Sequence, residues 1–176
     1  MRVSAQRAAE IAQDFCGASS PLERLGWGVG GFVYLSPKPG RVVKVHHGHH
    51  FGVELEVYQR LRRMRMTQLH GLHIPRLLSA REDYQLLEMD FVSAPYLLDF
   101  AGVLFAPPDY PEDAMEKWHA DIAEAYGPNA TLAYAVYHSL EQHGLWYMDF
   151  RPSNMKLDGL PGLEPYTPPS IDDLPW

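Results

Sequence analysis

The residues most suggestive of chemistry lie in the segment 147–154, which reads YMDFRPSN. Asp149 can orient a hydroxyl nucleophile, and Asn154, five positions later, can hold a metal ion through its amide oxygen. The pair predicts a site for phosphoryl transfer if phosphate-binding residues accompany it. A turn closed by Asx hydrogen bonds would explain the same two residues without any chemistry.

A glycine-rich segment lies far upstream of this pair. Gly26, Gly28, Gly31 and Val33 satisfy the pattern G-x-G-x-x-G-x-V. Glycine lets the backbone fold tightly over a polyphosphate and offer N–H groups to it, because a Cβ atom would obstruct the approach. The segment predicts a phosphate-binding turn, although a β-turn without a ligand would carry the same glycines.

A lysine and a glutamate follow the glycines. Lys44 lies in the valine-rich segment 41–45, and from a strand its ammonium could pair with nucleotide phosphates. A solvent-facing lysine on an edge strand is the alternative. Glu54 begins a predicted helix whose apolar register turns its carboxylate toward Lys44. Glu56 is the rival, but residues two apart point to different helix faces. A solvated surface glutamate would fit either position.

The elements that must position these residues are predicted from apolar spacing and capping residues. Helices are expected from the N-cap Ser4 to about Gly17 and over residues 51–66, 112–126 and 131–143. Residues 25–35 and 41–45 are expected to form two strands joined by a tight hairpin, and residues 84–92 one or two buried strand segments. The proline-rich residues 159–176 should be extended, with a short strand at 170–171. The pattern predicts an α+β protein.

Composition limits the compartment and the partners. The chain has 176 residues, 46% of them hydrophobic, and a formal net charge of −7, which argues against nucleic acid or an anionic membrane as the main partner. Cys16 is the only cysteine, so an intrachain disulfide is excluded; we expect a buried, small apolar group and a cytoplasmic protein. Neither a signal peptide nor an apolar stretch of roughly 20 residues is apparent, so no membrane partner is expected.

In this order of motifs, residues 26–158 resemble the protein-kinase-like superfamily. The resemblance implies a two-lobed fold: an N-lobe of a small antiparallel sheet plus a helix (18–93) and a truncated, mainly helical C-lobe with a proline-rich tail (94–176). The N-terminal helix (1–17), predicted from its apolar spacing, precedes both lobes. Residues 86–92 (LLEMDFV) are similar to the family's strand and hinge. Met89 would then be the gatekeeper, and the backbone of Asp90 and Val92 would bind adenine.

The resemblance also implies roles for the catalytic segment, with ATP and Mg²⁺ as cofactors. Asp149 would orient the attacking hydroxyl, and Asn154 would ligate Mg²⁺. Arg151 stands where the family's catalytic-loop lysine neutralises the transferring phosphate, and it changes the charge from a point to a planar fork. Lys44 and Glu54 would form the ion pair that holds the nucleotide phosphates.

The chain departs from the family in three places. Tyr147 and Met148 replace the histidine and arginine of the H-R-D motif, so regulation by loop phosphorylation is not expected. No D-F-G occurs; Asp172, with Asp173 close behind, is the nearest candidate for the second metal ligand. The A-P-E segment and the later peptide-docking helices are also missing before Trp176.

The resemblance and the three departures from the family leave three alternatives for the function. The first is an ATP- and Mg²⁺-dependent phosphotransferase that transfers the γ-phosphoryl group to a hydroxyl of a protein or small-molecule acceptor. The second is a catalytically inactive, pseudokinase-like module that binds nucleotide or protein. The third is an unrelated α+β domain with chance motifs. A truncated second lobe also implies a homo-oligomer or a partner protein that covers its apolar surface.

Four histidines, His46, His47, His49 and His50, form the last candidate cluster. Clustered imidazoles can bind zinc or nickel. No cysteine or acidic residue stands at ligand spacing in the sequence. We therefore predict adventitious or solvent-facing histidines here.

Overall fold

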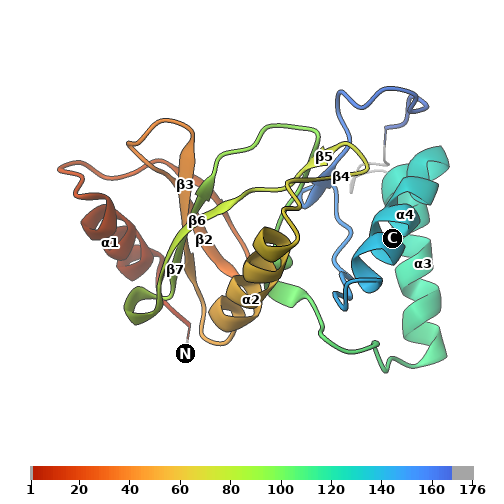
Figure 1. Cartoon of the computed structure of the whole chain (residues 1–176), viewed down its shortest axis with the longest axis horizontal. Helices are drawn as coiled ribbons and strands as arrows, with labels where there is room; N and C mark the ends of the chain where they lie inside the picture. Colours follow the sequence, from red (N-terminus) through yellow and green to blue (C-terminus); the bar gives the residue numbers. More distant parts are fainter. Residues whose placement is uncertain (1, 168–176) are drawn as a thin grey trace, which may run out of the picture. The chain divides into compact units, whose positions relative to one another are not determined.

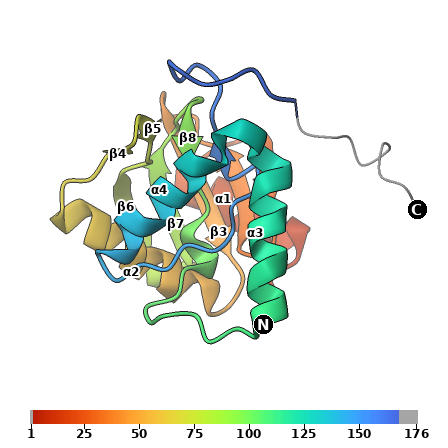
Figure 2. The ribbon, with the colours of Figure 1, turned by 90° about the vertical axis from the view of Figure 1, so that its right-hand side faces the viewer.

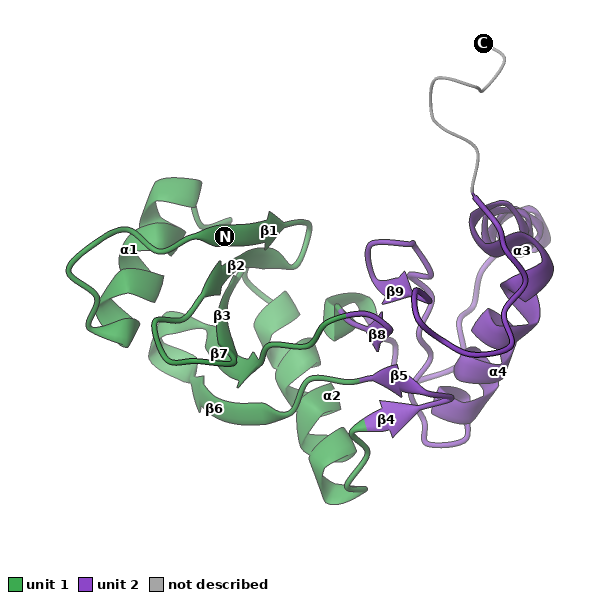
Figure 3. Cartoon of the chain, turned by 90° about the horizontal axis from the view of Figure 1, so that it is seen from above, with its two compact units in different colours: residues 1–67, 74–93, 99–102 green, residues 68–73, 94–98, 103–176 purple. Residues whose placement is uncertain are grey.

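The computed structural model describes residues 2–167 and shows an α+β protein with two compact units (Figure 3). Unit 1 comprises the residues up to Thr67, Ile74–Ser93 and Asp99–Gly102. Unit 2 comprises Gln68–His73, Ala94–Leu98 and the residues from Val103 onward. The predicted boundary after residue 93 therefore assigns two short segments to the other unit. Segment 68–73 pairs with a strand of unit 2, and segment 99–102 packs on helix α2 (His50–Arg63) of unit 1.

Unit 1 is built on a five-stranded antiparallel sheet with strand order β1-β2-β3-β7-β6. The strands are β1 (Arg24–Trp27), β2 (Gly31–Leu35), β3 (Arg41–His46), β6 (Leu77–Arg81) and β7 (Leu86–Asp90). The valine-rich β3 lies at the centre, where β-branched side chains fit the pleated, buried surface. Short 3₁₀ turns lie at η1 (Glu82–Tyr84) and η2 (Phe100–Gly102).

Two helices cover opposite faces of this sheet (Figure 1). Helix α1 (Ala5–Cys16) packs Ala8, Ile11 and Ala12 against side chains that include Val43 and Val45. Helix α2 (His50–Arg63) lies on the other face, where it meets Lys44. Because successive side chains of a strand alternate between faces, β3 directs Val43 and Val45 toward α1 and Lys44 and His46 toward α2.

The glycine-rich segment forms the turn between β1 and β2. Gly28 and Gly31 exchange backbone hydrogen bonds of 2.9 and 3.3 Å. Gly31 has φ +150°, and a Cβ atom on it would lie 2.1 Å from the carbonyl oxygen of Val45. The prediction of a single strand over residues 25–35 was therefore wrong, because these glycines fold the segment into a hairpin of its own.

Unit 2 contains two helices and a small sheet. Helices α3 (Glu112–Tyr126) and α4 (Ala130–Glu141) lie side by side (Figure 2) and are joined by the turn η3 (Gly127–Asn129). The sheet order is β4-β5-β8-β9, with strands β4 (Gln68–Leu69), β5 (Leu72–His73), β8 (Tyr96–Leu97) and β9 (Met155–Lys156). Only β5 and β8 run parallel among these described strands.

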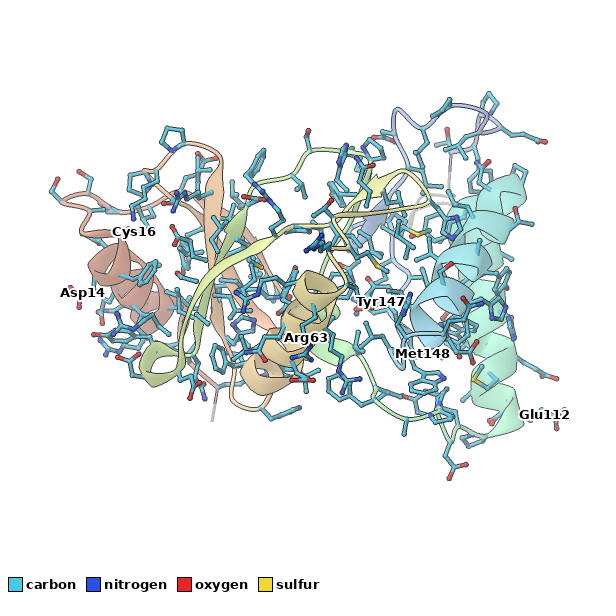
Figure 4. All side chains as sticks on the ribbon, viewed as in Figure 1. Asp14, Cys16, Arg63, Glu112, Tyr147 and Met148 are labelled. Carbon is cyan, nitrogen blue, oxygen red and sulfur yellow. The ribbon has the colours of Figure 1, made fainter. Side chains whose placement is uncertain are left out.

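The structure confirms the four predicted helices, and α3 has the predicted bounds. Helix α1 begins after the N-cap Ser4, whose hydroxyl accepts from the Arg7 N–H, and ends at Gly17 with φ +61°. Cys16 (Figure 4) is only partly buried, so the expectation of a buried thiol was wrong; it lies at the edge of the α1 core. No helix within the described part of the chain is long and apolar enough to cross a membrane. The strand predicted at 170–171 lies outside the described residues.

Candidate functional site

Lys44 is held between two carboxylates in unit 1. Its Nζ lies 2.7 Å from Oε2 of Glu54 on α2 and 2.8 Å from Oδ1 of Asp99. The Lys44 and Glu54 side chains are 7% and 1% exposed. Glu56 points away and pairs with Arg60 and with Arg63 on the outer surface of α2. The predicted choice of Glu54 over Glu56 is therefore confirmed.

The charges of this pair stabilise each other despite burial. Burial alone would raise the pKa of Glu54, but the Lys44 ammonium and the hydrogen bond from His46 lower it from 4.5 to about 2. Burial opposes a charged Lys44, yet Glu54 and Asp99 together raise the pKa of its ammonium. Both groups are thus ionised at neutral pH, and Lys44 is a fixed positive charge on the central strand.

The glycine-rich turn lies beside this charge. A Cβ atom on Gly30 would lie 3.4 Å from Nζ of Lys44, 3.3 Å from Oδ1 of Asp99 and 2.8 Å from Cβ of Ala101. Only glycine fits there without displacing Ala101. Val33 is the cross-strand partner of Lys44, while Gly26 lies on β1 and Gly28 begins the turn.

Asp99 is a site residue that the sequence analysis missed. It follows β8, has φ +57° and belongs to unit 1 through the short segment Asp99–Gly102. Its carboxylate is 32% exposed, far more than that of Glu54. No motif marks this aspartate in the sequence, because its position depends on the packing of the following turn, η2, against α2.

Two of the four histidines are buried, so the prediction of solvent-facing side chains was wrong for His46 and His47. His46 lies on β3 with Nε2 2.6 Å from Oε2 of Glu54, an acidic partner eight residues away. His47 accepts a hydrogen bond from the Val3 N–H at Nδ1, over 3.3 Å. Of the four histidines, His49 alone is exposed. β3 extends to His46, one residue beyond its predicted end.

The predicted gatekeeper Met89 and the two residues predicted to bind adenine, Asp90 and Val92, lie on β7 and just after it. Met89 is buried on β7, opposite Val42 of β3. Asp90 ends that strand, and its N–H already donates to the carbonyl oxygen of Arg76 over 3.1 Å. Val92 follows in a partly buried position outside any strand.

The loop of unit 2 predicted to be catalytic, residues 147–154, is anchored by its aromatic residues. Tyr147 (Figure 4) is buried, and its hydroxyl donates to the carbonyl oxygen of Leu98 over 2.8 Å. Phe150 packs edge-on against the Tyr147 ring, with centroids 4.9 Å apart. The carbonyl oxygen of Asn154 accepts from the Leu98 N–H over 2.7 Å. These contacts fix both ends of the loop that carries Asp149.

Within this loop, Asp149 and Asn154 meet directly. Nδ2 of Asn154 donates to Oδ2 of Asp149 over 2.9 Å and to its carbonyl oxygen over 3.3 Å. Arg151 forms a two-point ion pair with the same carboxylate, Nε to Oδ1 over 2.5 Å and Nη2 to Oδ2 over 3.0 Å. The predicted pair is therefore brought together. Arg151, to which the resemblance assigned the transferring phosphate, here contacts Asp149.

The oxygens of this loop could supply only one or two of the ligands of a Mg²⁺ ion. Oδ1 of Asn154 receives one long hydrogen bond, 3.3 Å from the Ser153 hydroxyl, and is a hard oxygen donor. Among residues 2–167 no group of three or more His, Cys, Asp or Glu side chains could hold a metal ion. Mg²⁺ commonly takes one or two protein oxygens and substrate phosphates, so the residues fit a nucleotide-borne ion. Asp172 and Asp173 lie outside the described residues.

No protein-family model matches the chain, and searches of curated proteins and of solved structures give no significant match either. Function must therefore be inferred from the residues and their geometry.

Proposed function

We propose that this protein is an ATP- and Mg²⁺-dependent phosphotransferase of the protein-kinase-like fold, which transfers the γ-phosphoryl group to a hydroxyl of a protein or small-molecule acceptor. The observation that carries the proposal is the buried Lys44–Glu54 pair, 2.7 Å apart, beside a glycine-rich turn. Burying two charges costs desolvation energy that their attraction barely offsets, so such a pair is a poor device for stability alone.

The sheet supports the same proposal. Its order, β1-β2-β3-β7-β6, has the glycine turn at one end and the Lys44 strand in the middle, with α2 following that strand directly. This is the small antiparallel sheet plus helix that the resemblance implies for an N-lobe. The proposed kinase-like fold thus rests on topology as well as on motifs.

Lys44 is assigned to the nucleotide phosphates. An ammonium has three N–H donors, and Glu54 and Asp99 take two of them. A polyphosphate would use the remaining donor and would compete with the more exposed Asp99 for a second. Glu54 would keep Lys44 in place during that exchange, which is the positioning that phosphoryl transfer requires.

Asp149 is assigned to the acceptor hydroxyl and Asn154 to the metal. Mg²⁺ brought by ATP would neutralise the charge that develops on the transferring group. The Asn154 amide donates to Asp149 and so orients that carboxylate, while its oxygen receives a long hydrogen bond of 3.3 Å from the Ser153 hydroxyl. One loop of unit 2 therefore presents both groups that the proposed transfer needs.

A second candidate, the inactive nucleotide-binding module, is favoured by Arg151. Its guanidinium contacts both oxygens of Asp149, so an acceptor hydroxyl would have to displace Arg151 to reach that carboxylate. A phosphate that attracts Arg151 would free Asp149, whereas a permanent pair would leave the loop inactive. The two candidates differ in turnover and agree in nucleotide binding.

Nucleotide binding is tested first, by thermal unfolding with and without ATP and Mg²⁺. A ligand that binds the folded state alone adds about 2.7 kcal/mol of stability at 100 times its dissociation constant. Lys44→Met should abolish the shift, and Lys38→Met, which changes an exposed lysine of the same unit, should retain it. Absence of a shift in the unaltered protein at millimolar ATP would refute both candidates.

Turnover is then measured with ATP labelled at the γ-phosphoryl group, offered to water and to hydroxyl-bearing acceptors. Asp149→Asn should abolish transfer while nucleotide binding persists, and Asp158→Asn, an exposed aspartate of the same unit, should leave transfer intact. Binding without transfer in the unaltered protein, unchanged by Arg151→Met, would decide for the inactive module.

A further inference from the structure

His46 occupies a place beside the Lys44–Glu54 pair that no motif explains. It lies two residues after Lys44 on β3, so both side chains point to the face covered by α2. Its side chain is fully buried, and its ring contacts the edge of Phe51 with centroids 5.6 Å apart. A fully buried imidazole must have its polar atoms satisfied within the protein.

Both ring nitrogens of His46 face hydrogen-bond acceptors. Nδ1 lies 3.1 Å from the carbonyl oxygen of Gln85, and Nε2 lies 2.6 Å from Oε2 of Glu54. A neutral imidazole carries one N–H and one lone pair, so one of these contacts would set a lone pair against an oxygen. Only the imidazolium, with two N–H groups, donates to both.

The surrounding charges favour the same state. Glu54 from α2 contacts both His46 and Lys44 of β3. Lys44 also contacts Asp99, so the cluster contains two carboxylates and two basic side chains. With His46 charged, two cations balance the two carboxylates of the cluster; with His46 neutral, the four groups together carry a net charge of −1, of which Asp99, 32% exposed, is partly solvated. Burial and then nearby cations lower the pKa of the adjacent His47, whose Nδ1 accepts a hydrogen bond, as a neutral ring can.

The oxygen of Glu54 that faces His46 is a carboxylate oxygen. Although burial raises the pKa of Glu54, the Lys44 ammonium 2.7 Å away lowers it, so Glu54 accepts a hydrogen bond from His46 and does not donate one. One oxygen, Oε2, accepts from both Nζ of Lys44 and Nε2 of His46. The two donors converge on that atom and fix its position.

We propose that His46 is a positioning residue: as an imidazolium it anchors Glu54, and Glu54 in turn fixes the ammonium of Lys44. That Lys44 then serves a nucleotide rests on the proposed function, whereas the charge and the anchoring are properties of the protein without a ligand. His46 itself contacts no substrate in this scheme and acts through Glu54.

The charge of His46 is tested by nitrogen NMR of the ligand-free, ¹⁵N-histidine-labelled protein at pH 7. Two protonated ring nitrogens on His46, assigned by loss of its signals in His46→Gln, are the expected result. A single protonated nitrogen, as in a neutral tautomer, would overturn the proposal. The exposed His49 provides the reference ring in the same spectrum.

The anchoring is tested by amine labelling and mass spectrometry. His46→Phe keeps a ring against Phe51 but donates no hydrogen bond, so Lys44 should react roughly tenfold faster, while Lys38 reacts as before. His46→Gln, which keeps one donor, should show a smaller increase, and His49→Phe none. Equal Lys44 labelling in folded His46→Gln and in the unaltered protein would refute the anchoring, whether or not His46→Phe folds.

ATP affinity separates this proposal from the proposed function. If ATP binds, His46→Phe should weaken it roughly tenfold, and His46→Gln should weaken it less. If ATP does not bind, the proposed function fails, but an imidazolium and the labelling change would still support the anchoring of Lys44. Normal ATP affinity in His46→Phe would show that His46 does not position Lys44.

Discussion

Replacing Glu54 with glutamine is the most direct perturbation of the candidate site. The substitution keeps the shape of the side chain and removes its charge. Lys44 and His46 then remain buried beside a neutral amide, and the amide can direct a donor toward one of them. The charge removed is the one on which both cations depend.

Two independent estimates give the size of the effect. Removing one partner of a buried ion pair costs about 3–5 kcal/mol. The pKa of Glu54 falls from 4.5 to about 2 on folding, and at about 1.36 kcal/mol for each pH unit this corresponds to roughly 3 kcal/mol. We therefore expect Glu54→Gln to lower the free energy of unfolding by about 3 kcal/mol, or the unfolding temperature by roughly 6–12 °C.

Urea and thermal unfolding of the ligand-free protein measure this loss, and Glu56→Gln is the matched control. Glu56 lies on the same helix, carries the same charge and pairs with arginines, but its side chain is 39% exposed. Exposed pairs contribute about 0.2–1 kcal/mol. Equal losses for the two variants would refute the reasoning, because burial of the charge would then have no energetic consequence.

The remaining predictions concern acid, the glycine turn and Asp99. A carboxylate whose pKa is lowered on folding stabilises the folded state at pH values above its pKa in the unfolded chain. The difference in unfolding free energy between the unaltered protein and Glu54→Gln should therefore be complete above pH 4.5 and should vanish as the pH falls toward 2. Urea midpoints measured across this pH range test the prediction. Gly31→Ala should cost roughly 1–3 kcal/mol by urea unfolding, because its Cβ would meet the Val45 carbonyl, whereas Gly28→Ala, with open space around the Cβ position, should cost less; equal costs would contradict the turn geometry. Asp99→Asn should tighten ATP binding roughly fivefold by calorimetry, since it removes a competitor for Lys44, and weaker binding would instead make Asp99 part of the nucleotide site.

The parts of the site that the sequence predicted are those set by local periodicity. Strand alternation decides which face receives Lys44, and the apolar register of a helix decides between Glu54 and Glu56. The same alternation would have placed His46 on the face of Lys44, two residues away. The strand alternation that places His46 beside Lys44 is thus visible in the sequence, but the neighbouring His47, His49 and His50, which lie outside the strand, do not follow it.

Asp99 and the small strands could not be predicted in this way. Strands β4, β5, β8 and β9 have two residues each, too few for a period of two to appear. Asp99 depends on a backbone with positive φ and on the packing of η2 against α2, which are tertiary effects. Sequence periodicity contains no information about contacts between such distant segments.

The two carboxylates on Lys44 have different roles because they are held differently. Glu54 is almost fully buried and receives a second hydrogen bond from His46. If Lys44 and Glu54 separated, both charges would remain buried without their ion-pair partner. Asp99 is 32% exposed, and water can solvate its carboxylate when the ion pair opens. An incoming anion would therefore exchange with Asp99 and leave Glu54 in place. Lys44 thus combines one permanent partner, which fixes its position, with one exchangeable partner, which a phosphate would replace if the proposed function is correct.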